Sequence, residues 1–445
     1  MAKTWLMFGY SFGSAGAYVT ARTLSDSEFL SQIGAQELPE VYLASAGAVA
    51  FTSAIYARIT RQFALLPSVL GTQLLLAMTS ILLALGSQFD LIGIEVASLF
   101  LITQIRGSLG TIQLGMLIND QFSFPVRRQV IGRVLLGATS AGFLFGVATG
   151  VLTTWVSPFH LLWLIAAIDL ATALPVFLLG SKSAIQPTIP ADHLPTNSVN
   201  DQANDAAEPE NADAGLKRQG GTADSLPHRF PRVHRPLRHY TWAILFMVGT
   251  AVVVNTLVEL QWKTIVSDAL HANEHALALY FGIFYAVLYL ATGTFQYGVT
   301  AVLIKRLGVV GSLLLFPVML LIAIALIPLA AAHRGTSLLL ATWAKGNDVF
   351  KRSATDPAVH LLFAVFPPEQ RHRALTLSAG IVKPLCEALT AALLILTGDL
   401  LPASRYSLIL FLLIPLWVVA IWRVGGLYRA LSPEGLSEPL DPTET

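Results

Sequence analysis

The sequence is poor in charged residues and in cysteine, and both shortages narrow the classes of protein it can encode. Only 12% of its 445 residues are Asp, Glu, Lys or Arg, where a soluble globular protein carries about 25%. So few charges cannot cover a water-exposed fold, and 54% hydrophobic residues exclude a disordered chain. The single cysteine excludes a disulfide framework and a zinc site of several cysteines. Lys and Arg number 28 against 27 Asp and Glu, so the composition predicts a membrane protein with no nucleic-acid partner.

Long apolar runs recur along the chain, and each is long enough for a membrane-spanning helix of about 20 residues. The runs are continuously apolar, which favours helices over the alternating pattern of a β-barrel. They form two groups of six: 4–25, 39–57, 64–87, 91–118, 130–152 and 159–180, then 241–265, 275–304, 308–332, 337–362, 374–397 and 404–425. We predict an all-α membrane protein with twelve transmembrane helices in two pseudo-symmetric six-helix halves.

A polar gap separates these two groups. We assign residues 1–180 to an N-terminal half, 181–240 to a cytoplasmic linker, 241–430 to a C-terminal half and 431–445 to a cytoplasmic tail. The linker is too polar to bury a core, which predicts disorder. Lys and Arg gather in every second loop, with Arg334 as the exception, and such loops lie on the cytoplasmic side. Both termini are therefore predicted to be cytoplasmic, with lipid bilayer around the two halves.

The two halves resemble one another in sequence. Residues 23–29 align with residues 256–262 at an offset of 233, which places Asp26 opposite Glu259. Residues 125–137 align with residues 368–380 at the similar offset of 243. A tandem duplication of a six-helix unit explains both offsets. This is the architecture of major-facilitator transporters, whose substrate lies near the membrane midplane between the halves.

Charged side chains inside the predicted spans are candidates for function, because each costs at least ~2.5–3.5 kcal/mol at the bilayer centre. Bases recur on five spans in both halves, and converging bases suit an anion such as phosphate. The residues predicted to bind substrate are Arg22, Arg106, Glu259, Lys263, Lys351, Arg352 and Lys383. The residues predicted to gate or couple transport are Asp26, Asp120, Arg127, Arg128, Asp348 and Glu387.

Some of these charges have a purely structural alternative. Glu259 with Lys263, and Lys383 with Glu387, lie four residues apart on a helix. Each pair therefore shares one helical face and could neutralise itself while locking helices together. Arg106 has no carboxylate near it on its own helix, so it needs either a partner on another helix or an anionic ligand.

Short motifs add one packing prediction and several exclusions. Gly142, Gly146 and Gly150 recur at every fourth position of the fifth span, which predicts close packing against a neighbouring helix. No Gly-x-x-x-x-Gly-Lys-Ser/Thr or His-Glu-x-x-His motif occurs in the sequence. We therefore expect no ATP-driven pump, no metal site, no cofactor and no enzymatic activity.

Several stretches together resemble the ATP/ADP translocases of plastids and intracellular bacteria. Residues 257–263 resemble that family's Leu-Val-Glu-x-x-Trp-Lys stretch. Residues 22–39 resemble its first-span signature, and residues 119–142 resemble its connection between the fourth and fifth spans. The resemblance covers nearly the whole chain except the linker. It implies a major-facilitator-like carrier in the bacterial inner membrane that exchanges ATP for ADP or moves other nucleotides, with Glu259 and Lys383 as functional charges.

Two departures from that family keep other functions open. Ser25 stands where the family often has lysine, and the stretch from Thr103 to Arg106 lacks the family's glutamate and tryptophan. The first alternative is a proton-coupled major-facilitator carrier of another organic or phosphorylated anion. The second is a non-transporting membrane sensor or scaffold, which the short tail disfavours because it cannot form a domain. The expected partner is thus a nucleotide or another anionic small molecule.

Overall fold

A computed structural model of the protein describes residues 2–86, 92–122, 124–184, 234–328, 333–366, 374–375, 377–397 and 403–431. The N-terminal half consists of α1 (Ala2–Glu28), α2 (Leu38–Gln62), α3 (Leu65–Gly86), α4 (Ile92–Gln121), α5 (Phe124–Leu152) and α6 (Leu161–Ala184). The long helices of the C-terminal half are α7 (His234–Ala269), α8 (Glu274–Gly298), α9 (Thr300–Leu326) and α15 (Ala403–Leu431). Its shorter helices are α10 (Arg334–Gly346), α11 (Asp348–Phe350), α12 (Asp356–Leu362) and α14 (Lys383–Thr397).

Three π-helical turns and three 3₁₀ turns complete these helical elements. The π turns are η1 (Phe29–Ile33), η6 (Lys351–Thr355) and η8 (Ser378–Val382). The 3₁₀ turns are η2 (Ala35–Glu37), η3 (Pro158–His160) and η7 (Phe363–Val365). Because α10, α11, η6 and α12 follow one another as a single segment, and η8 continues into α14, the two halves contain six segments each. The predicted twelve-helix architecture is confirmed.

The surface of these helices is that of a membrane protein. Nine helices of the described residues are long and apolar enough to cross a membrane. Large apolar side chains lie on the outside of the bundle, and Leu82, Leu396 and Trp422 are more than half exposed. A water-soluble monomer rarely exposes so much apolar surface. The chain is an integral, multi-pass membrane protein.

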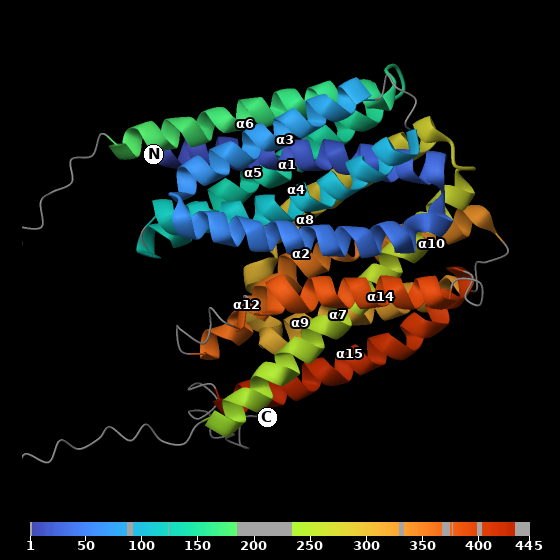
Figure 1. Ribbon diagram of the computed structural model, residues 1–445. Coiled ribbons are helices and arrows are strands. Elements are labelled where there is room, and N and C mark those ends of the chain that lie inside the picture. The colour runs from blue at the N-terminus through green and yellow to red at the C-terminus, as the bar shows by residue number, and fades with distance from the viewer. Residues whose placement is uncertain are drawn as a thin grey trace, which may run out of the picture.

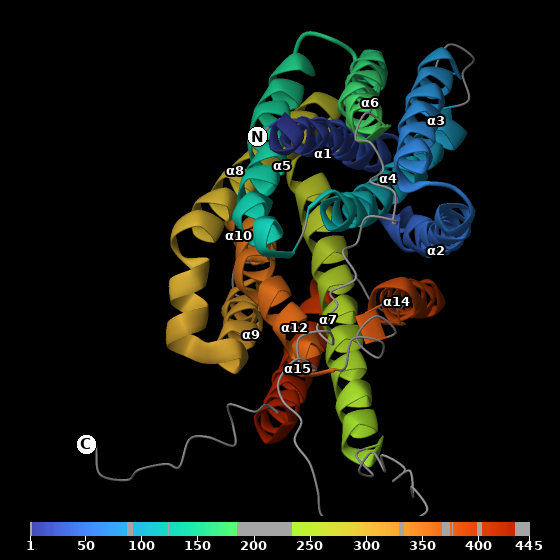
Figure 2. The same ribbon diagram turned by 90° about the vertical axis from the view of Figure 1, so that its left-hand side faces the viewer.

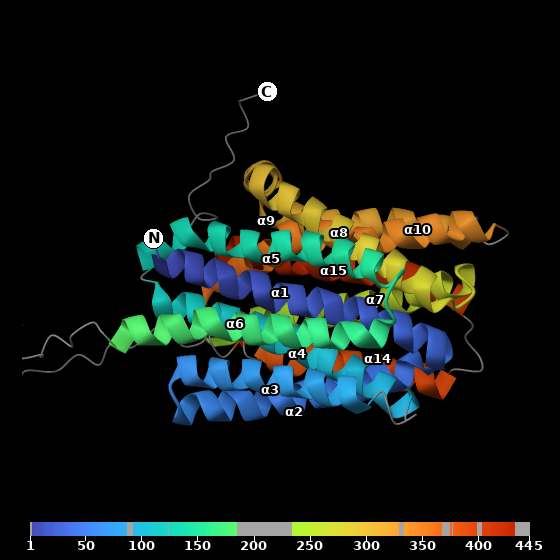
Figure 3. The same ribbon diagram turned by 90° about the horizontal axis from the view of Figure 1, so that it is seen from above.

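The two halves lie side by side, and most of their helices run along a common axis (Figure 1). The start of α1, the start of α7 and the end of α15 all lie at the same end of the bundle, which we call the terminal end. We call the opposite end, where α7 ends and α10 begins, the far end. Figure 3 shows that the helices of the N-terminal half run nearly along this axis. At the far end, η1 and η2 pack against α7, so the halves meet there.

Two helix pairs join the halves along their length. In Figure 2, viewed from the terminal end, α2 lies beside α14 and α5 lies beside α8. The α5–α8 crossing depends on glycine, because a Cβ atom on Gly282 would lie 2.7 Å from the backbone of Gly150. A Cβ on Gly146 would lie 2.9 Å from the backbone of Gly282 and Ala286. The close packing predicted for the glycines of the fifth span is confirmed, and its partner is α8.

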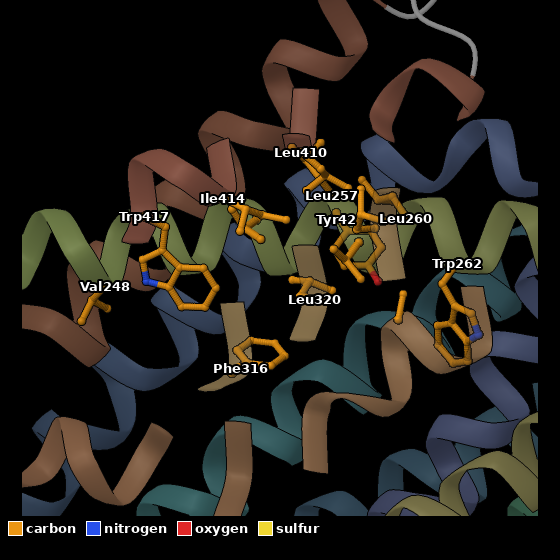
Figure 4. Close-up of a cluster of buried hydrophobic side chains, with 14 of the residues drawn as sticks. Tyr42, Val248, Leu257, Leu260, Trp262, Phe316, Leu320, Leu410, Ile414 and Trp417 are labelled. Carbon is orange, nitrogen blue, oxygen red and sulfur yellow. The ribbon is translucent and has the colours of Figure 1, made fainter. Parts of the chain in front are cut away.

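The C-terminal half has an apolar core that fixes α7 against its neighbours (Figure 4). Leu257 and Leu260 of α7 point toward Leu410 and Ile414 of α15. Deeper in the same core, the rings of Phe316 and Trp417 meet edge-on with centroids 5.6 Å apart. This packing holds α7 against α15, and a hydrogen bond of 2.6 Å from Gln261 of α7 to the Ser407 hydroxyl of α15 adds to it.

The helix ends differ from the predicted spans at several places. The predicted span 275–304 is wrong at its end, since α8 ends at Gly298 and α9 begins at Thr300. Gly308 then breaks α9 with φ +67° and ψ −177°, a conformation that glycine adopts without a Cβ clash. The helices α6 and α7 extend into the predicted linker. Its residues 185–233 and the tail from 432 onward lie outside the described residues.

Candidate functional site

A cavity of about 600 Å³ lies where the two halves meet, lined by residues of both. Tyr18, Tyr42 and Thr111 line it from the N-terminal half. The C-terminal half supplies an apolar, partly aromatic set: Met247, Val248, Phe316, Phe363, Trp417 and Ile421. It also supplies a charged set: Glu259, Lys345, Lys351, Asp356, Lys383 and Glu387. The cavity therefore offers both charge and apolar surface, and it extends from Glu259 toward the terminal end.

Three bases and three acids form an ion-pair network across the halves. We call this network the interhalf cluster: Arg22, Asp26, Glu259, Lys263, Lys345 and Asp348. The cluster is formally neutral, which suits a buried position, because a buried charge is costly unless it is paired and hydrogen-bonded. It borders the cavity on the side away from the terminal end.

Lys263 lies at the centre of the interhalf cluster and is fully buried. Its Nζ lies 2.7 Å from Asp26 Oδ1 and 3.3 Å from Glu259 Oε1. It also donates to the Tyr42 hydroxyl at 3.0 Å. Asp26 and Glu259 are the residues that align between the two halves of the sequence. The internal repeat thus brings two equivalent carboxylates together around one base.

Arg22 makes the second connection between the halves. It pairs with Glu259 of α7, and its Nε donates to the Tyr285 hydroxyl of α8 at 2.9 Å. Tyr285 in turn donates to Asp26 at 2.6 Å. Charge-assisted hydrogen bonds of this kind are roughly twice as strong as neutral ones. The predicted i,i+4 pair of Glu259 with Lys263 is confirmed as a contact, but both residues also bind partners in the other half.

Lys345 extends the interhalf cluster onto α10, and the predicted substrate-binding and gating residues did not include it. Its Nζ lies 3.3 Å from Glu259 Oε2 and 2.8 Å from Asp348 Oδ2. The ammonium group also lies 6.0 Å from the centroid of the buried Trp262 ring. The spacing of Lys345 and Asp348, three residues apart, is a signal in the sequence that could have revealed this pair.

Three predicted site bases make no ion pair with any carboxylate of the described residues: Lys351, Arg352 and Lys383. Lys351 and Lys383 line the cavity. The guanidinium of Arg352 lies 5.0 Å from the centroid of the Tyr289 ring. Glu387 also lines the cavity, and no ion pair joins it to Lys383. The alternative in which Lys383 and Glu387 neutralise one another stays a prediction.

Arg106 finds its partner on another helix. Its guanidinium pairs with Asp169 of α6 and donates to the Ser80 hydroxyl of α3 at 3.0 Å. All three side chains are buried. The sequence left open either a partner on another helix or an anionic ligand. The structure shows a partner on another helix, Asp169. Arg106 still lines a smaller pocket of about 340 Å³, which Arg352 also lines.

The predicted gating residues Asp120, Arg127 and Arg128 belong to the α4–α5 connection. Asp120 is exposed at the end of α4, where its carboxylate accepts a hydrogen bond from Gln121 at 2.8 Å. Arg127 and Arg128 lie in the first turns of α5, and their side chains are outside the described part of the structure. The predicted gating role of these three residues stays a prediction.

The three π turns were not predicted, and each lies next to charged residues of the site. η1 follows the segment that carries Asp26, η6 contains Lys351 and Arg352, and η8 ends directly before Lys383. Single π turns inside α-helices are rare and are frequently found at functional sites. Their positions therefore agree with the site chosen from the charges.

Solved structures provide the comparison that decides the fold. The chain matches the structure of the nucleoside transporter NupG with a TM-score of 0.58 and 12% identity, covering 96% of this chain and 99% of the other. It matches a D-xylose-proton symporter with a TM-score of 0.60 and 12% identity, covering 99% and 98%. The chain has the major-facilitator fold. Identity this low shows the fold alone.

Sequence comparison gives no closer relative. The sequence matches no protein-family model and no curated protein. The resemblance to ATP/ADP translocases therefore stays a prediction that rests on the stretches given above. The predicted major-facilitator-like architecture is confirmed by the solved structures.

Proposed function

We propose that the protein is a secondary transporter of nucleotides, which exchanges ATP for ADP by alternating access. One observation carries this proposal: Lys351 and Lys383 line the cavity between the two halves without an ion-pair partner among the described residues. The same cavity is lined by Phe316, Phe363 and Trp417. Unpaired bases suit phosphate, and the aromatic side chains suit a purine base.

The size of the cavity agrees with such a substrate. Pockets for small organic ligands and cofactors typically have volumes of about 300–1,000 Å³, and this cavity measures about 600 Å³. Its place between the two six-helix halves is where major-facilitator carriers bind substrate. With the termini predicted to be cytoplasmic, the cavity extends toward the cytoplasm, as in an inward-facing carrier.

The interhalf cluster supports exchange over uncoupled transport. In the structure its six charges neutralise one another and hold the two halves together beside the cavity. A polyphosphate that enters the cavity competes with Glu259 for Lys345, and so loosens these pairs. The empty carrier keeps all the pairs and changes conformation slowly. Only the loaded carrier then crosses readily between its two states, which couples the two directions of flux.

The decisive experiment is counter-exchange in liposomes that contain the purified protein. We expect uptake of labelled ATP to be at least about tenfold faster with ADP inside than with an empty interior, since a loaded carrier reorients faster. Protein-free liposomes are the control. Equal uptake under both conditions would remove exchange from the proposal, and no uptake of any nucleotide would remove nucleotides as the substrate.

A second candidate is a proton-coupled carrier of another organic or phosphorylated anion. Glu387 supports it, because this carboxylate lines the cavity without an ion pair and could take up a proton with the substrate. One solved structure of the same fold is described as a D-xylose-proton symporter. The same liposomes distinguish the two candidates. An imposed pH gradient would then drive anion uptake with no ADP inside, whereas an exchanger would not respond.

A further inference from the structure

Two carboxyl groups from opposite halves meet at the far end of the bundle. Glu28 lies in the last turn of α1, and Glu274 begins α8. The two helices pack against one another, and the two carboxyl groups lie within hydrogen-bonding reach. Glu28 is only 1% exposed, whereas Glu274 is partly exposed. Neither residue belongs to the interhalf cluster, and neither lines the cavity.

The carboxylate of Glu28 lacks the partners that a buried charge needs. Neither of its oxygens has a hydrogen-bond partner among the described residues, and no described base forms an ion pair with it. Burial of an unpaired charge is costly, and a second carboxylate beside it adds repulsion. One proton removes both costs, because a protonated carboxyl donates a hydrogen bond to its neighbour. A proton also needs no exposed surface in order to bind there.

The titratable groups around Glu28 supply no compensating positive charge within the described part of the chain. Besides Glu274, the elements that pack against α1 carry three such groups toward the far end: Glu95 of α4, His160 of η3 and His275 of α8. Nδ1 of His275 lies 2.7 Å from the carbonyl oxygen of Thr153, and His160 is exposed. Of the described residues, only Glu274 acts directly on the Glu28 carboxyl group.

The internal repeat gives an independent indication that this position is neutral. Residues 23–29 align with residues 256–262, which places Glu28 opposite Gln261. Gln261 is also buried, and its amide donates to the Ser407 hydroxyl at 2.6 Å. A protonated glutamic acid has nearly the shape of glutamine and, like glutamine, carries a hydrogen-bond donor. The neutral acid therefore suits the buried position of Glu28.

We propose that Glu28 and Glu274 form a proton-binding site that holds the far end closed, with one proton shared between the two halves. In the structure this end is closed, since η1 and η2 pack against α7. When the halves part there during alternating access, water reaches both carboxyl groups and the proton leaves. With the termini predicted to be cytoplasmic, this proton comes from the outside and returns to it. The site senses external pH and moves no proton across the membrane.

This inference goes beyond the proposed function, because it holds for any substrate. The closed end binds the proton more tightly than the open end. The ratio of closed to open molecules therefore falls as the pH rises, by up to about tenfold per pH unit. A sodium ion is the alternative occupant, and it needs more ligands than two carboxyl groups. The described residues contain no group of three or more acidic, histidine or cysteine side chains placed to hold a metal ion.

Distances across the far end, measured by electron paramagnetic resonance, test the site without any substrate. In a Cys386→Ser background, spin labels on Gln36→Cys of η2 and Thr336→Cys of α10 report on one half each, and both positions are exposed. The purified protein in nanodiscs is measured from about pH 5 to about pH 9, a range above the ordinary pKa of a carboxyl group. We expect one short distance at low pH and a growing population of longer distances as the pH rises.

Two variants remove the shared proton, and a third is the control. Glu28→Gln mimics the protonated acid and should stay closed at every pH. Glu274→Gln gives Glu28 an amide donor and should also flatten the pH dependence; it replaces Glu28→Gln if that variant does not fold. His275→Asn should keep the full pH dependence.

Three results would overturn the proton site. The first is a distance distribution that does not change with pH in the protein with native Glu28 and Glu274. The second is an unchanged pH dependence in both glutamine variants. The third is closure at about pH 9 by sodium chloride but not by choline chloride, which would assign the site to sodium. Nucleotide transport is judged separately, by the counter-exchange assay.

Discussion

Arg106→Ala lowers the free energy of unfolding by about 3–5 kcal/mol, because it leaves the buried Asp169 carboxylate without its partner. Arg106 and Asp169 are 4% and 1% exposed, so water cannot solvate the carboxylate that remains. Ser80 also loses its donor. The measurement is the thermal unfolding midpoint of the detergent-solubilised protein, which we expect to fall by many degrees.

A double variant separates the lost charge pair from other effects of the substitution. Arg106→Met combined with Asp169→Leu replaces both charges by apolar groups of similar size. Such replacements of buried pairs are often neutral or stabilising, so the double variant should unfold well above Arg106→Ala. If Arg106→Ala and the double variant unfold at the same temperature, the ion pair does not account for the stability of this region.

Glu259→Gln lets the empty carrier reorient, so that uptake of ATP no longer requires ADP inside. Glu259 contacts Arg22, Lys263 and Lys345, so its neutralisation leaves the cluster with three bases and two acids. Breaking a buried pair costs about 3–5 kcal/mol, so the pairs that slow reorientation of the empty carrier are lost, and uptake of ATP with no ADP inside should rise at least about tenfold. Because Glu259 also lines the cavity, removing its charge should strengthen the binding of an anion.

Two measurements on the same preparation test this split between binding and transport. For Glu259→Gln, uptake of ATP into empty liposomes should approach the rate seen with ADP inside, and the dissociation constant for ATP should fall. Glu40→Gln is the matched control, since Glu40 is an exposed carboxylate of α2 outside the cavity, and it should leave both quantities unchanged. Uptake by Glu259→Gln that still requires ADP inside would show that the interhalf cluster does not control the transport cycle.

The sequence predicts the fold well because the bilayer constrains it strongly. Every span needs a long apolar run, and hydropathy shows each run directly. The errors are local: a break at Gly308, which no apolar pattern reports, and the extensions of α6 and α7 into the predicted linker. Charge spacing correctly predicted the contact of Glu259 with Lys263, since i,i+4 neighbours share a helical face.

Spacing along one helix could not predict ion pairs between residues of different helices. Arg106 and Asp169 lie 63 residues apart, and periodicity within one helix cannot show which helices meet. The meeting of Asp26 with Glu259 had a signal, because these residues align in the internal repeat, and a pseudo-symmetric fold brings equivalent positions together. The π turns change the backbone hydrogen bonding over a single turn, and no residue pattern in the sequence predicts them.

The two unpaired bases of the cavity carry the proposed function, and isothermal titration with ATP tests them directly. Lys351→Ala and Lys383→Ala should each raise the dissociation constant at least about tenfold, or about 1.4 kcal/mol, through loss of a charge-assisted contact with phosphate. Lys305→Ala, which removes an exposed base of α9 outside the cavity, should leave it unchanged. Unaltered ATP binding by both cavity variants, or no ATP binding by the unmodified protein, would contradict the account.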